Sequence, residues 1–90
     1  MDNGHSLTLL RFWAPWCVPC KLIEPTVEKV LGDFDNIKMV SINVDEEPDV
    51  VAEYRIRAVP AFVLLEDNMI VEKLIGSVSA QQLKDFLSIK

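Results

Sequence analysis

Two cysteines, Cys17 and Cys20, are the only thiols in this 90-residue sequence, and two residues separate them. Residues three apart lie on the same face of a helix. Their Cα atoms can therefore come within the ~4.4–6.8 Å that a disulfide needs. A bridge over so short a loop constrains little of the unfolded chain and adds little stability. The spacing predicts a dithiol that is made and broken in a reaction rather than a structural crosslink.

The neighbouring residues indicate which thiol reacts first. Pro19 suits the first turn of a helix, where its missing N–H would be unpaired anyway. Cys17 would then precede the free N–H groups and the positive end of the helix dipole, which favour a thiolate and lower the thiol pKa. Lys21 adds a nearby positive charge. We therefore expect Cys17 to be the nucleophile and Cys20 to be the resolving thiol, placed deeper and one turn on.

Four stretches have the residue pattern of strands, and they must carry the dithiol. They are residues 7–13, 37–44, 61–65 and 69–75. A helix is expected between the first two, which predicts that they lie parallel. The last two are joined by a tight turn at residues 66–68, which predicts an antiparallel hairpin in which Asn68 tolerates a positive φ.

Three stretches have the pattern of helices, namely residues 19–32, 48–54 and 80–89. Apolar residues at helical spacing predict the core face of the first, with Gly32 at its C-terminal cap. That face consists of Leu22, Ile23, Val27, Val30 and Leu31. In the third, Ser79 is the expected N-cap, and the expected buried stripe is Leu83, Phe86 and Leu87. Together the elements predict an α/β domain of three layers, with flanking helices on a four-stranded mixed sheet. Residues 1–90 are expected to be one domain, with residues 1–6 as a flexible tail.

The segment Trp16-Cys17-Val18-Pro19-Cys20-Lys21, preceded by Phe12-Trp13-Ala14, resembles the active-site segment of thioredoxins. Further similarities cover nearly the whole chain, at Pro25, Val44-Asp45, residues 56–60 and Gly76. The resemblance implies a thioredoxin-like fold and thiol–disulfide exchange with protein disulfides, without an organic or metal cofactor. It also implies a cis bond between Val59 and Pro60 and a thioredoxin reductase-like electron donor. The substrate-contacting residues that it implies are Trp16, Val18, Pro19, Ala58, Val59, Pro60 and Gly76.

The sequence departs from the thioredoxin pattern at the dithiol. Arg11 stands where thioredoxins usually carry a buried aspartate, and Ser41 stands where they carry its lysine partner. Two interpretations of Arg11 are open: its head group extends to water, or it approaches Cys20 and favours a thiolate there. The second predicts a dithiol stabilised in its reduced form, and so a weaker reductant. Val18, where the family usually has glycine, also argues against a typical thioredoxin potential.

Thioredoxins usually begin with an extra strand and helix that this sequence lacks, which predicts a less protected sheet edge.

Three other functions remain as alternatives. The short length favours a glutaredoxin-like, glutathione-coupled oxidoreductase, although the tryptophan before Cys17 favours thioredoxin. A zinc module would need four ligands, whereas the sequence offers two cysteines and His5 in a polar tail. A non-catalytic interaction domain is the third alternative, and the intact dithiol speaks against it as the only role.

Charge and composition restrict the expected partners and location. The net charge is −5, which argues against nucleic acid and anionic membranes as partners. No apolar run approaches the ~20 residues of a membrane span, and the N-terminus lacks the pattern of a signal peptide. We therefore expect a cytoplasmic monomer whose partners are disulfide-containing proteins, with no metal site.

Overall fold

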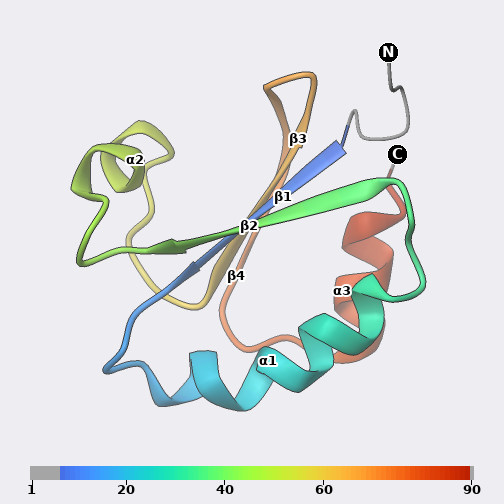
Figure 1. The fold of residues 1–90 in the computed structure, drawn as a ribbon, viewed down its shortest axis with the longest axis horizontal. Coiled ribbons are helices and arrows are strands. Elements are labelled where there is room, and N and C mark those ends of the chain that lie inside the picture. The colour runs from blue at the N-terminus through green and yellow to red at the C-terminus, as the bar shows by residue number, and fades with distance from the viewer. Residues whose placement is uncertain (1–6, 90) are drawn as a thin grey trace.

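The structure is a computed structural model, and it describes residues 7–89 as a four-stranded mixed sheet with three helices (Figure 1). The strands lie in the order β2-β1-β3-β4. Their bounds are β1 Leu7–Trp13, β2 Ile37–Asn43, β3 Ala61–Glu66 and β4 Met69–Ile75. The helices are α1 Val18–Leu31, α2 Pro48–Glu53 and α3 Ala80–Leu87. The predicted flexible tail, residues 1–6, lies outside the described residues.

Strand β1 is central and determines which helix covers which face of the sheet. It pairs in parallel with β2 and antiparallel with β3, as the connections predict. Successive side chains of a strand point to opposite faces. Leu9 therefore packs with Phe62 of β3 against α1 and α3, whereas Phe12 packs with Val63 on the face covered by α2. Figure 1 shows α1 and α3 together on one side of the sheet and α2 on the other, so the predicted three-layer fold is confirmed.

Helix α1 uses a narrower apolar face than the sequence predicts. Its buried residues are Cys20, Ile23, Val27 and Val30, which follow the three- and four-residue spacing of one helix face. The prediction that Leu22 belongs to the core is wrong, because its side chain is 75% exposed. Leu22 follows Cys20 by two residues, and a helix turns by about 100° per residue, so it points away from the sheet.

The other predicted helix and turn signals are largely confirmed. Ser79 caps α3 in a reciprocal capping box with Gln82, which satisfies two backbone N–H groups of the helix start. Asn68 has a positive φ of 70°, and Asp67 beside it also has one, of 53°. Gly32 is the C-cap of α1 but has a right-handed φ of −61°. Its position therefore does not exploit the left-handed freedom of glycine.

Candidate active site

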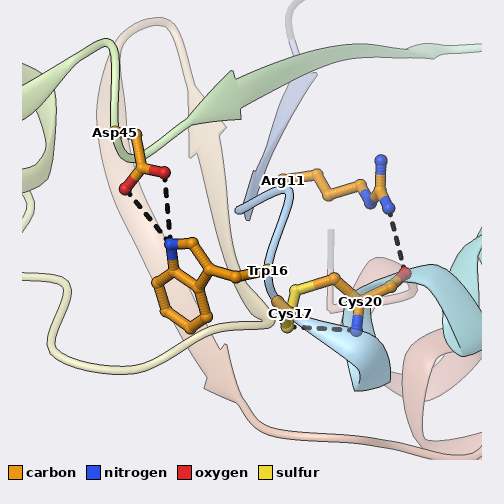
Figure 2. Close-up of a disulfide and its surroundings, with 5 residues drawn as sticks. All are labelled: Arg11, Trp16, Cys17, Cys20 and Asp45. Carbon is orange, nitrogen blue, oxygen red and sulfur yellow. Dashed lines mark hydrogen bonds between the residues drawn. A yellow bond between two sulfur atoms is a disulfide. The ribbon is translucent and has the colours of Figure 1, made fainter.

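The two cysteines meet at the N-terminus of α1 and form a disulfide (Figure 2). Their Cα atoms are 5.3 Å apart, inside the range that the spacing predicts. Cys17 is the N-cap residue, and its Sγ accepts a hydrogen bond of 3.1 Å from the backbone N–H of Cys20. Pro19 lies in the first turn, as predicted. The sulfur of Cys17 therefore lies at the start of the helix with the N–H of Cys20 donating to it, an arrangement that stabilises negative charge on that atom.

Trp16 directly precedes Cys17, and its indole is held by an acidic residue that the sequence interpretation did not include in the site. The indole Nε1–H donates to both carboxylate oxygens of Asp45, at 3.3 and 3.1 Å (Figure 2). The ring nevertheless remains 66% exposed. Trp16 follows β1 and Asp45 follows β2, and the carboxyl ends of parallel neighbouring strands meet at one edge of the sheet. That rule could have predicted the contact.

The Val59–Pro60 peptide bond is cis, in the turn that leads into β3. The carbonyl of Pro60 accepts a 2.8 Å hydrogen bond from the backbone N–H of Gly76 at the end of β4. Gly76 has φ +101°, and a Cβ built there meets nothing within 4 Å. Glycine is therefore favoured at this position by backbone conformation rather than by lack of space. The bond ties the cis-proline turn to the end of the hairpin.

The residues that the resemblance assigns to substrate contact differ in exposure. Trp16, Val18, Pro19 and Ala58 are exposed, Val59 and Gly76 are half-buried, and Pro60 is buried. A hollow of about 170 Å³ is lined by Trp16 together with Ala58 and Val59. Its remaining lining residues are Val44, Val51, Ile56 and Arg57. A protein surface that docks here would therefore meet mainly apolar side chains next to Trp16.

A second hollow of about 260 Å³ lies between α1 and the segment that connects β4 to α3. It includes Pro19 and the exposed Leu22, and Thr26, Ile23, Ser77 and Val78 complete its lining. The sequence interpretation missed this extension because it assigned Leu22 to the core. Exposed apolar surface beside the dithiol thus continues past Pro19 along the helix.

Arg11 lies on the α1 face of β1 and is only 6% exposed. Its Nη2 donates to the backbone carbonyl of Cys20 at 3.2 Å (Figure 2), and its Nη1 lies 4.0 Å from a carboxylate oxygen of Glu24. The interpretation in which the head group extends to water is therefore wrong. Strand alternation explains this, because Leu9 and Arg11 share the face that α1 covers. Its register partner on β2 is Ser41, the residue that stands where thioredoxins usually carry a lysine.

Burial of this guanidinium has a cost that the surrounding contacts only partly offset. Within residues 7–89, the Nε of Arg11 has no hydrogen-bond partner. A buried, unsatisfied donor costs about 1–3 kcal/mol, and a buried charge needs close partners to be tolerated. Arg11 therefore occupies a position that a neutral residue would fill at lower cost, beside the carbonyl of a reactive cysteine.

No cluster of three or more histidine, cysteine or acidic side chains suited to a metal ion occurs in the described part of the chain. In this structure both thiols are engaged in the disulfide. His5 lies outside the described residues. None of the helices formed by residues 7–89 is both long enough and apolar enough to cross a membrane.

The sequence profile of the thioredoxin family matches residues 1–89. The chain belongs to the thioredoxin family. Thioredoxin of Pyropia yezoensis is 36% identical over 87 residues, which cover 96% of this chain and 81% of that protein. With the cysteine pair of the family present and able to bridge, the chain is a thiol–disulfide oxidoreductase that acts on protein disulfides.

Solved thioredoxin structures have the same fold. A single-substitution mutant of thioredoxin from Halobacterium salinarum superposes with a TM-score of 0.83 at 35% identity, covering 91% of this chain and 72% of that one. Oxidised mitochondrial thioredoxin 3 of Saccharomyces cerevisiae gives a TM-score of 0.85 at 32% identity, with 91% and 76% covered. Both structures are similar to this chain in sequence as well as in fold. This chain therefore shares its four-stranded core with them.

Proposed function

We propose that this chain reduces disulfides of other proteins, with Cys17 as the nucleophile and Cys20 as the resolving thiol. The observation that carries the proposal is the place of Cys17 at the N-cap of α1, where its Sγ accepts the N–H of Cys20. A thiolate is the attacking species in disulfide exchange, and this position favours it at Cys17. Lys21, one turn further along the helix, adds positive charge.

The proposed reaction has two exchange steps. The Cys17 thiolate attacks one sulfur of the substrate disulfide, so that a mixed disulfide forms and the other substrate sulfur leaves as a thiolate. The thiolate of Cys20 then attacks the Sγ of Cys17, which forms the Cys17–Cys20 bond and releases the second substrate thiolate. Two electrons pass from the dithiol to the substrate, and each released thiolate takes a proton from water.

The proposed substrate site runs from Trp16 and Val18 across Pro19 to Ala58, Val59, Pro60 and Gly76. Within residues 7–89, the backbone N–H and carbonyl of Val59 make no hydrogen bond. A backbone residue with free N–H and carbonyl groups, packed beside the cysteines, can pair with a substrate segment as a strand would. Main-chain pairing surrounded by apolar contacts depends little on the side chains of the substrate. Such a site therefore favours binding of many protein substrates rather than one.

The proposed setting is a cytoplasmic monomer that receives its electrons from a thioredoxin reductase. A reducing compartment keeps such a dithiol available for the next cycle. If the monomer is correct, the elution volume in size-exclusion chromatography stays constant over a hundredfold range of protein concentration. A shift toward earlier elution at high concentration would contradict it.

The test of the proposed donor compares two electron sources with insulin as the protein disulfide. We expect the oxidised protein to reduce insulin when NADPH and a bacterial-type thioredoxin reductase are supplied, and to be much slower with NADPH, glutathione and glutathione reductase. The exposed tryptophan before Cys17 and the extended apolar surface fit a protein partner better than a tripeptide. Faster turnover with glutathione would instead favour the glutaredoxin-like alternative.

Arg11 is proposed to tune the dithiol. Its guanidinium lies against the Cys20 carbonyl and, within residues 7–89, has no negative partner closer than the 4.0 Å to Glu24. Positive charge at this place stabilises a thiolate, and so the reduced form, more than it stabilises the uncharged disulfide. The dithiol is therefore a weaker reductant than it would be with a neutral or acidic residue at position 11.

We predict that Arg11→Asp makes the reduction potential more negative by about 30 mV or more, since 30 mV corresponds to about 1.4 kcal/mol for a two-electron couple. Equilibration with glutathione buffers of known ratio measures the potential. Lys38→Met is the control, because it removes an exposed positive charge from β2 and should leave the potential unchanged. Equal potentials for Arg11→Asp and the parent would exclude the tuning role.

A further inference from the structure

The side chain of Cys20 is nearly sealed from bulk solvent, so its proton needs an acceptor inside the molecule. Cys20 must become a thiolate before it can attack the mixed disulfide, yet it is only 1% exposed. The position from which the family's aspartate would take this proton carries Arg11 instead. A guanidinium is always protonated and cannot accept a proton. Another group must therefore take up the proton each time the mixed disulfide is resolved.

A hollow of about 520 Å³ borders Cys20 on the side away from Trp16 and Val59. Its lining residues are Arg11, Trp13, Cys20, Lys21, Glu24 and Ser41. This volume is large enough for several water molecules, and the polar groups of Arg11, Glu24 and Ser41 would offer them hydrogen-bond partners. Among the charged residues of this lining, only Glu24 offers acceptor oxygens, because the guanidinium of Arg11 and the ammonium of Lys21 are donors without an acceptor.

Two contacts direct Glu24 toward this role. It lies four residues after Cys20 in α1, so the two side chains share one helix face. Its carboxylate is 4.0 Å from the guanidinium of Arg11, which also donates to the Cys20 carbonyl. At the same time the Glu24 side chain is 52% exposed. A proton received inside the hollow can therefore pass from Glu24 to bulk solvent without any movement of the fold.

We propose that Glu24 is the proton acceptor for Cys20, through water in this hollow, and that Arg11 is the positioning residue that holds Glu24 there. The S–H bond of Cys20 breaks, its proton moves through water to a carboxylate oxygen of Glu24, and the thiolate attacks the Sγ of Cys17. The Cys17–Cys20 bond forms as the bond to the substrate sulfur breaks. The inference rests on the proposed function, because it concerns the second exchange step.

The test uses 5,5′-dithiobis(2-nitrobenzoate) in single-turnover stopped-flow experiments with the reduced protein. Attack by Cys17 releases one coloured thionitrobenzoate, and attack by Cys20 on the mixed disulfide releases the second. At pH 6–7 we expect Glu24→Gln to slow the second phase about tenfold or more, since a positioned base typically contributes 10²–10⁴-fold. The first phase should keep its rate. Above pH 9 the second phases of variant and parent should converge, because hydroxide removes the proton directly.

Glu28→Gln is the matched control, since Glu28 is also an exposed carboxylate of α1, one turn beyond Glu24. The inference is overturned if the second phase of Glu24→Gln equals that of Glu28→Gln at every pH. It is also overturned if Glu24→Gln slows that phase equally at every pH, because a merely structural role would do this. A parent protein with no second phase would instead contradict the role of Cys20 in the proposed function.

Discussion

We expect Cys17→Ser to reduce the rate of insulin reduction by about 10³-fold or more, down to the uncatalysed background. A serine hydroxyl at this position is a poor nucleophile toward sulfur, and loss of a covalent nucleophile removes most of the catalytic effect of the residues that act with it. Cys17 lies at the N-cap of α1, with the Cys20 N–H 3.1 Å from its sulfur. The only other thiol in the sequence is Cys20, which is 1% exposed.

Cys20→Ser is the matched control for this experiment. It also removes the disulfide, but it leaves the attacking thiol in place. We expect it to form a mixed disulfide with the substrate that accumulates and is detected by mass spectrometry. Because the bridge closes so short a loop, both variants should retain nearly the stability of the disulfide-bonded parent. Substantial insulin reduction by Cys17→Ser, or an adduct formed on Cys20 in that variant, would reverse the proposed order of attack.

Phe62→Ala is expected to lower the free energy of unfolding by about 3–5 kcal/mol. Phe62 is fully buried in β3, in the cluster that joins the sheet to α1 and α3. Removing its ring takes away apolar burial and leaves a cavity that the surrounding strands cannot close completely. A small domain has a total stability of only about 5–15 kcal/mol, so this one substitution removes a large part of it.

Urea unfolding followed by circular dichroism measures this effect, with Met69→Ala as the control. Met69 is an exposed apolar residue at the start of β4, and its truncation should change the stability by less than about 0.5 kcal/mol. Similar changes for the two variants would mean that the cluster between the sheet and these two helices does not dominate stability.

Arg11 acts on two different quantities in the proposals above, and the experiments separate them. The reduction potential is an equilibrium property, and it changes if the guanidinium stabilises the Cys20 thiolate. The second thionitrobenzoate phase is a rate, and it depends on Glu24. Arg11→Asp should therefore alter both, because it removes the positive charge and also the group that holds Glu24. Glu24→Gln should alter mainly the rate.

Local signals in the sequence were sufficient for most of the fold. The two-residue spacing of the cysteines, Pro19 in the first turn and the Ser79 cap each depend on neighbours within a few positions, so the observed elements agree with them. The parallel and antiparallel strand pairings followed from the lengths of the connections. Helix ends shifted by one to a few residues, because the last turn of a helix has few contacts that determine where it stops.

The surroundings of the dithiol, in contrast, were decided by packing between distant segments. The Arg11–Glu24 pair joins residues on different elements, so local sequence does not predict it. The Trp16–Asp45 hydrogen bond could be predicted only from the pairing of β1 with β2. Leu22 is apolar like a core residue, but the sheet covers only the face of α1 that contains Cys20 and Ile23. The sequence by itself thus determined that a reactive dithiol begins a helix. Only the tertiary structure decided which charges face it, because strand alternation and helix packing choose those neighbours.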